Sequence, residues 1–192
     1  MNAILATTDD FLLALKGTMP WTLLKDLKEI SKMDMKFFRE KTRGATIVMG
    51  YNTWLSLNET PLAGRGTHYI ITSKKIESTN NVKYVTLEEF KNKYMKKEQN
   101  LWCIGGATIY EKLIPYCENI YWNEIIINRR SFKRLVEHSP GHEKLYLSKI
   151  LKDILQTRGK ASYNEISTQL VSDKNDSLIV YHHIMKKNTH KY

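Results

Sequence analysis

Apolar residues along the chain gather into short runs that polar or glycine-containing segments separate. One run covers residues 101–104, and Gly105 and Gly106 separate it from the helix-compatible segment 107–114. A short apolar run bounded by turn residues is typical of a strand buried on both faces. Glycines at its end let another molecule approach the backbone closely, because they carry no Cβ. The same pattern also fits an ordinary strand-to-helix turn of an α/β domain.

Similar runs predict the other elements. Strands are indicated at residues 1–6, 45–49, 68–72, 82–85, 101–104, 119–127, 163–171 and 177–185. Helices are indicated at 22–33, 31–41, 87–94, 107–114 and 144–155, with a short one around Thr53 and Trp54. Strands that alternate with helices predict an α/β fold whose central, mostly parallel sheet has about eight strands and helices on both faces. The short turn after residue 171 makes the C-terminal strand antiparallel.

The sequence also predicts a helix start near Ser31 and an insert before it. Ser31 and Asp34 have the spacing of a capping box in its acidic form, which predicts a helix beginning there. Apolar residues at helical spacing predict a helical insert at 22–33, and residues 128–155 have no assigned role. The chain is otherwise expected to form one domain over residues 1–192.

Composition is that of a globular protein. The 192 residues are 42% hydrophobic and 26% charged. No apolar run approaches the roughly 20 residues needed to cross a bilayer, and the N-terminus lacks a secretory pattern, so we expect a cytoplasmic protein without membrane contact. Cys103 and Cys117 have no metal-ligand spacing; they are expected to be buried thiols, and no metal is expected.

The net charge of +10 could attract nucleic acid, an acidic surface or a small anionic ligand. The lysines are scattered over residues 91–97 and 186–191 rather than forming one stripe with interleaved aromatic residues. We therefore interpret them as solvated helix faces and a basic tail. Nucleic acid is not expected as a partner, and a monomer is favoured.

Seven short motifs occur in one order along the chain. They are Ala6 at the end of the first strand, Met19-Pro20-Trp21, 34–39, 47–50 with Thr53-Trp54, 61–65, 70–73 and 104–110. This series resembles the dihydrofolate reductase family from Met1 to about Asn123, with a looser match in the last two strands. The resemblance implies the fold of that family. It also implies an oxidoreductase of one-carbon metabolism that reduces 7,8-dihydrofolate to 5,6,7,8-tetrahydrofolate by hydride transfer from NADPH.

Asp34 matches the acid that the family places against the pterin ring. A buried carboxylate can bind the amino-pyrimidine edge through two hydrogen bonds and favour the protonated ring. Phe37 and Phe38 would share its helical face. Asp26 is the alternative acid, because it lies at the family's usual spacing after Trp21. Asp34 has the usual spacing before the strand at 45–49. An isolated Ser-x-x-Asp pattern favours a helix-capping acid, and the surrounding motif series favours the pterin-binding role instead.

The resemblance implies further site residues. Catalysis would involve Asp34, Trp21, Tyr110 and Asn123, the last of which stands where the family usually has a threonine. The substrate would contact Ile4, Leu5, Asp34, Phe38, Leu62, Arg65 and Ile104. NADPH would contact Ala6, Gly17, Thr18, Met19, Gly50, Thr53, Thr72, Ser73, Lys74, Gly105, Gly106, Ala107, Thr108 and Ile109. The glycine pair would be joined by a cis peptide, and Arg65 would bind the α-carboxylate of the folate tail.

One position departs from the family pattern. Tyr51 stands where a basic residue usually contacts the cofactor's 2′-phosphate, so a preference for NADPH over NADH would depend on Ser73, Lys74 or Lys75. Two other functions stay open. One is a reductase of the same fold that acts on another pterin or on a flavin-pathway pyrimidine. The other is a non-catalytic basic binding or structural protein that retained the fold.

Overall fold

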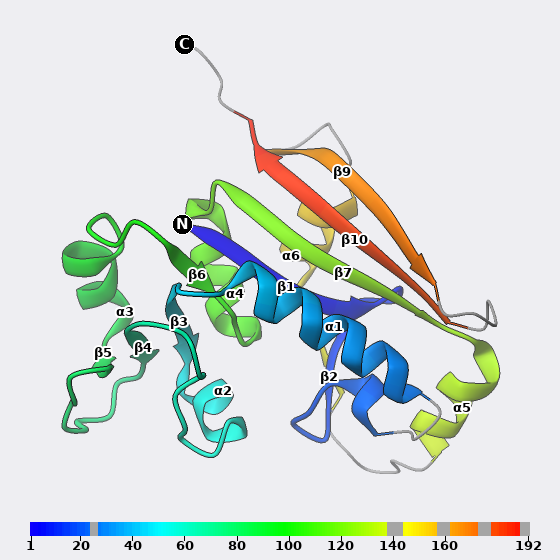
Figure 1. Ribbon diagram of the computed structural model, residues 1–192, viewed down its shortest axis with the longest axis horizontal. Helices are drawn as coiled ribbons and strands as arrows, with labels where there is room; N and C mark the ends of the chain where they lie inside the picture. Colours follow the sequence, from blue (N-terminus) through cyan, green and yellow to red (C-terminus); the bar gives the residue numbers. More distant parts are fainter. Residues whose placement is uncertain (24–26, 138–143, 157–161, 173–177, 189–192) are drawn as a thin grey trace.

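A computed structural model describes residues 1–23, 27–137, 144–156, 162–172 and 178–188. Its centre is an eight-stranded sheet in the order β5-β4-β3-β6-β1-β7-β10-β9 (Figure 1). The strands are β1 (Asn2–Thr8), β3 (Thr46–Gly50), β4 (His68–Ile71), β5 (Val82–Val85), β6 (Leu101–Cys103), β7 (Asn119–Ile127), β9 (Tyr163–Ser172) and β10 (Leu178–Lys187). The eight predicted strands are therefore confirmed.

The sheet is parallel from β5 to β7. Central strand β1 pairs with β6 through Ala3 opposite Cys103, and with β7 through Ala6 opposite Asn123. Strand β10 is antiparallel to β7 and to β9, as predicted; the turn predicted between the last two strands falls largely on 173–177, outside the described residues. The sheet is thus mostly parallel with an antiparallel C-terminal end, which is the predicted architecture.

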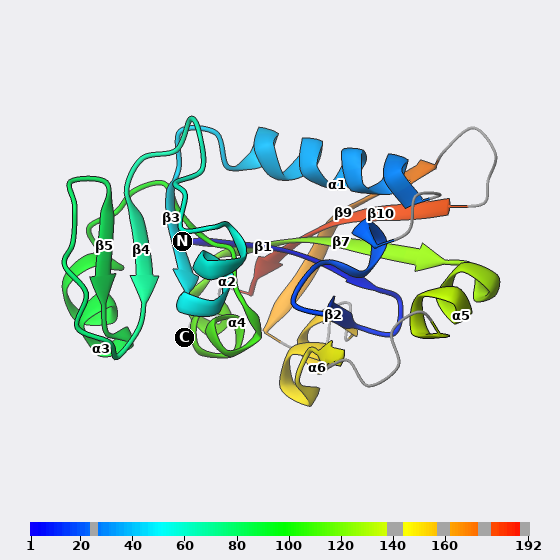
Figure 2. The same cartoon turned by 90° about the horizontal axis from the view of Figure 1, so that it is seen from below.

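Helices lie on both faces of the sheet. They are α1 (Lys28–Lys41), α2 (Tyr51–Ser56), α3 (Leu87–Glu89), α4 (Ala107–Leu113), α5 (Arg129–Glu137) and α6 (Lys149–Gln156). Figure 2 shows α1 on one face and α4 and α6 on the other. A π-helical turn at Phe90–Tyr94 continues α3, and 3₁₀ turns lie at Pro20–Thr22 and Ile114–Tyr116.

The predicted capping box is wrong. One helix runs from Lys28 to Lys41, so Ser31 and Asp34 lie inside it, and its N-cap residue Leu27 contributes no side-chain hydrogen bond. Leu27 and Ile30 are buried in the same cluster as Trp21, and this packing extends the helix toward its N-terminus without a cap. The predicted insert at 22–33 is therefore in part the beginning of α1. Residues 24–26, Asp26 among them, lie outside the described residues.

The unassigned region 128–155 forms defined elements. It contains α5, α6 and strand β8 (Lys144–Tyr146), which pairs antiparallel with β2 (Leu12–Leu15) in a small second sheet. The helix predicted at 144–155 is correct from Lys149 onward and wrong before it. The sequence pattern also missed β2, because a four-residue strand that pairs mainly with a distant segment leaves little periodic signal.

Two further observations concern membrane span and thiols. No described helix has both the length and the apolar character needed to span a membrane. Cys103 and Cys117 are buried and free, as predicted, and burial raises the pKa of the Cys103 thiol to about 12.

Gly105→Ala tests how closely the fold packs at the end of β6. Gly105 has a φ of +95°, and an added Cβ would lie 2.4 Å from Cε2 of Tyr110. We expect the substitution to lower the free energy of unfolding by about 3 kcal/mol, because backbone strain and overpacking combine. Gly44→Ala is the matched control. Its φ is +68° with nothing within 4 Å of an added Cβ, so a loss of about 1 kcal/mol is expected. Urea denaturation measures both, and equal losses would contradict the packing argument.

Candidate functional site

The parallel strands bring several of the predicted site residues to one edge of the sheet. Gly50 ends β3, Thr72 follows β4 and Gly105 follows β6, so all three lie at or just beyond carboxyl ends of strands. Ala6 lies near the carboxyl end of β1, opposite Asn123 of β7. In sheets of this kind, ligands bind beyond the carboxyl ends of the strands.

Asp34 is the buried acid of this edge. It lies in α1 with 4% of its surface exposed, and Nδ2 of Asn123 donates a 2.7 Å hydrogen bond to its Oδ1. Burial raises the pKa of Asp34 to about 6, while Asn123 and the Trp21 indole act in the opposite direction. The Trp21 N–H makes no hydrogen bond of normal geometry with any described residue. The structure thus brings Asp34, Asn123 and Trp21 together.

Asn123 also contacts a residue that the sequence analysis missed. Its Oδ1 lies 2.6 Å from Nδ1 of His182 in β10. The His182 ring stacks on Phe37 of α1, with centroids 4.2 Å apart and planes 13° apart. The strand predicted at 177–185 places His182 and His183 on opposite faces, but the sequence holds no signal for the register that sets His182 opposite Asn123.

Tyr110 and the glycine pair connect α4 with three strands. The Tyr110 hydroxyl donates to the Ile4 carbonyl at 2.7 Å, and the Gly50 N–H donates to the Gly105 carbonyl at 2.7 Å. The Gly105–Gly106 peptide is cis, as the resemblance implied. A Cβ on Gly106 would lie 3.2 Å from the Thr53 hydroxyl, so that hydroxyl is at the corner between β6 and α4.

Arg65 is fixed in the loop before β4. Its guanidinium donates to the Ala63 carbonyl at 2.7 Å and twice to Oγ1 of Thr42, at 2.8 and 3.2 Å. It also lies over the ring of Phe38, 5.3 Å from the centroid. Arginine has five N–H donors, so these three bonds leave two for a ligand.

His68 is a second residue that the sequence analysis missed. It is fully buried in β4, and its Nε2 accepts a 3.0 Å hydrogen bond from the backbone N–H of Leu62. Burial lowers the pKa of His68, which keeps the ring neutral and able to accept. His68 therefore anchors the loop that carries Leu62 and Arg65, a contact that only the folded loop reveals.

Strand alternation separates the residues expected near the substrate. Ile4 packs with Phe37, Phe38 and Ile104 on the α1 side of the sheet. Leu5 packs instead in the cluster that contains Tyr110, on the other face. Ile109 lies in this second cluster too, and its Cγ1 would be 2.9 Å from a Cβ on Gly50.

The remaining predicted cofactor residues lie in turns. Thr18 exchanges backbone hydrogen bonds with Leu15, while Gly17 has a φ of +71° and Met19 is 40% exposed. After β4, Oγ1 of Thr72 accepts a 3.1 Å bond from the Lys74 N–H, next to exposed Ser73. Nζ of Lys74 lies over the ring of Tyr51, 4.4 Å from its centroid.

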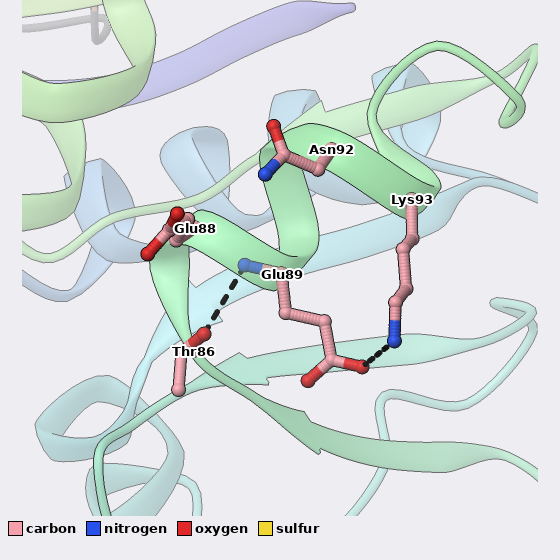
Figure 3. Close-up of a pocket in the computed structure, with 5 residues that line it drawn as sticks. All are labelled: Thr86, Glu88, Glu89, Asn92 and Lys93. Atoms are coloured by element: carbon pink, nitrogen blue, oxygen red, sulfur yellow. Dashed lines mark hydrogen bonds and ion pairs between the residues drawn. The ribbon is translucent and has the colours of Figure 1, made fainter.

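Figure 3 shows a pocket at the start of α3, next to the end of β5, where the Val85 carbonyl accepts a 2.9 Å hydrogen bond from the Thr72 N–H. Its lining residues are Thr86, Glu88, Glu89, Asn92 and Lys93. Oγ1 of Thr86 accepts from the Glu89 N–H at 3.1 Å, and Lys93 pairs with Glu89 at 3.0 Å. These groups satisfy one another as an ordinary helix start does. Within the described ranges, no cluster of His, Cys, Asp and Glu is arranged to hold a metal ion.

Fold and site together define an α/β protein with two features at the carboxyl edge of a mostly parallel sheet. One is the buried acid Asp34, and the other is the Gly105–Gly106 turn between β6 and α4, called the glycine corner below. The sequence model of the dihydrofolate reductase family matches residues 1–133. The chain therefore belongs to the dihydrofolate reductase family. This confirms the expected family.

Relatives and a solved structure agree with this assignment. The chain is 28% identical over 130 residues to a dihydrofolate reductase of Buchnera aphidicola, covering 67% of this chain and 73% of that protein. It is 24% identical to a bifunctional dihydrofolate reductase-thymidylate synthase of Paramecium tetraurelia, over 99% of this chain and 35% of that one. A dihydrofolate reductase from Enterococcus faecalis complexed with NADP(H) and RAB-propyl has a TM-score of 0.72 at 22% identity, covering 98% and 96% of the two chains. The shared fold is thereby confirmed.

Asp34→Asn tests how much the buried carboxylate lowers the free energy of unfolding when it is ionised. The pKa of Asp34 rises from 3.8 to about 6 on folding, so the folded protein binds a proton more tightly than the unfolded chain does. Stability from this group is therefore lost as the pH rises from about 4 to about 6, by about 3 kcal/mol. We expect Asp34→Asn to be more stable than the wild type at pH 7, and the two to converge near pH 4. Urea denaturation at both values checks this; a constant difference would contradict the raised pKa.

Proposed function

We propose that this protein reduces 7,8-dihydrofolate to 5,6,7,8-tetrahydrofolate with NADPH. Membership of the dihydrofolate reductase family supports the reaction, and the similar structure from Enterococcus faecalis is a complex with NADP(H). The observation within this chain that carries the proposal is the buried Asp34 carboxylate, held by Asn123 at the carboxyl edge of the sheet. We also propose, as the sequence leads us to expect, that residues 1–192 form one domain and that the protein is monomeric and cytoplasmic.

Asp34 would bind and orient the pterin. Asn123 bonds to one carboxylate oxygen, and an ionised carboxylate has about four acceptor sites, so both oxygens can still accept N–H groups of an amino-pyrimidine edge. Such a charge-assisted pair favours the protonated ring, which is the better hydride acceptor. The free Trp21 N–H beside Asp34 offers one more donor to a substrate atom or a bridging water.

The glycine corner would hold the cofactor's phosphates. Gly105 is buried against the Tyr110 ring, while Gly106 is partly exposed and lies beside the Thr53 hydroxyl at the same corner. Ala107 and Thr108 begin α4, where backbone N–H groups favour anions. NADPH, when bound, supplies the hydride; the protein supplies its position.

The region around Tyr51 would select the 2′-phosphate. Tyr51 itself carries no charge, but its ring lies under Nζ of Lys74, and this contact restrains the ammonium group next to Ser73. Lys74 would then replace the basic side chain that the family usually has at the position of Tyr51.

Arg65 favours a folate over a smaller substrate. Two of its N–H groups stay available after the bonds to Ala63 and Thr42, and a carboxylate accepts such a pair in bidentate fashion. Pterins and pyrimidines without a glutamate tail would leave this arginine without a ligand.

Loss of NADPH absorbance with and without dihydrofolate tests the proposed reaction. We expect oxidation of NADPH that depends on dihydrofolate. Asp34→Asn should lower the rate by two or more orders of magnitude at pH 7 and less in acid, where solvent protonates the substrate. A near-normal rate for this variant would assign the role to another acid, such as Asp26. Strong, salt-sensitive polyanion binding without turnover would instead support the non-catalytic alternative.

Arg65→Leu tests the contact to the folate tail. We expect weaker binding of folate by roughly 10²-fold with NADPH binding nearly unchanged, because the substitution removes a charge-assisted pair. Arg65→Lys should recover only part of the affinity, since a lysine cannot reproduce the bidentate geometry. Isothermal titration with each ligand measures both effects. Equal losses for folate and NADPH would refute the assignment.

A further inference from the structure

His182 is a buried polar residue that the proposed reaction does not use. It lies in β10 with 9% of its surface exposed, and its Nδ1 is 2.6 Å from Oδ1 of Asn123. Asn123 is 1% exposed and donates through Nδ2 to Asp34 at 2.7 Å. The three side chains therefore form a continuous hydrogen-bonded row from β10 through β7 to α1.

The chemistry of an amide fixes the direction of this row. An ionised carboxylate only accepts hydrogen bonds, so the NH₂ group of Asn123 must face Asp34. The amide oxygen then faces His182 and requires a donor there, which is Nδ1–H. With Nδ1 as an acceptor, the amide would instead turn its NH₂ toward His182 and its oxygen toward Asp34. That oxygen would repel a carboxylate and accept only from a protonated acid.

We propose that His182 is a positioning residue: its Nδ1–H holds the Asn123 amide with the NH₂ group toward Asp34 and so keeps the acid in its ionised, pterin-binding form. The catalytic consequence rests on the function proposed above. The arrangement itself is a property of the free protein.

The surroundings of His182 favour the neutral ring that this role needs. Burial lowers its pKa first, and the charges of Lys41 on α1 and His183 on β10 act in the same direction. Glu40 on α1 acts in the opposite direction. From β9, the residue paired with His182 is Gln169, which does not titrate. From β7, the contact is Asn123 itself. A neutral imidazole carries one N–H, and the stack on Phe37 holds the ring so that this N–H can point at Asn123.

Two substitutions separate the hydrogen bond from the packing. His182→Phe keeps a flat ring against Phe37 and removes the donor. His182→Asn removes the ring and keeps a donor, because the asparagine Nδ2 occupies nearly the place of the histidine Nδ1. Titration of the Asp34 carboxyl by ¹³C NMR, assigned with Asp34→Asn, measures the effect in the ligand-free protein.

We expect the pKa of Asp34 to rise by about one unit in His182→Phe and to stay near the wild-type value in His182→Asn. The pH profile of kcat/KM should move in the same direction, with recovery in the asparagine variant. An unchanged Asp34 titration in His182→Phe, or equal shifts in the two variants, would overturn the proposal.

A measurement on the wild type alone covers the case in which a variant does not fold. The ¹⁵N shifts of the His182 ring report which nitrogen carries the proton, and we expect the Nδ1–H form at pH 7. The Nε2–H form would overturn the proposal. Both NMR readouts are independent of turnover, so absence of NADPH oxidation would refute the proposed function and leave the role of His182 separately decided.

Discussion

The hydrogen bond from Asn123 to Asp34 is the interaction on which the proposed chemistry depends. It joins α1 to β7 and gives a buried carboxylate one strong donor, which only partly offsets the loss of hydration. The acid is therefore held near pKa 6, where small changes in its partners decide whether it is charged. Further hydrogen-bond donors would stabilise the ionised carboxylate, but they would occupy the acceptor sites that a protonated ring needs.

The other half of the site depends on Tyr110. Its hydroxyl bonds to the Ile4 carbonyl of β1, and its ring fills the space in which a side chain at residue 105 would lie. The Gly50 N–H at the end of β3 donates to the Gly105 carbonyl just after β6. The glycine corner is thus fixed from β1 as well as β3, and β1 also carries Ala6 opposite Asn123. One central strand sets the spacing between the acid and the corner.

The sequence predicted what depends on local pattern and family motifs. Apolar runs located all eight strands of the large sheet, and motif spacing selected Asp34, whose contact with Asn123 the structure contains. The sequence analysis failed where contacts between distant residues determine the structure. Helix α1 begins before Ser31 because Leu27 and Ile30 pack on the sheet. His68 and His182 acquire their partners only when loop and strand register bring them to Leu62 and Asn123.

Strand β8 and helix α6 contact elements that carry the site. Strand β8 pairs with β2, whose last residue Leu15 bonds to Thr18 in the turn before Met19. Leu147 donates to the Phe11 carbonyl at 3.1 Å, and Leu151 and Leu155 of α6 join the buried cluster that contains Tyr110. Strand β8 thus pairs with the strand that leads into the turn expected at the cofactor, and α6 packs in the cluster of Tyr110, which shapes the glycine corner. Both contributions consist of apolar surface and one strand edge, which many sequences can supply.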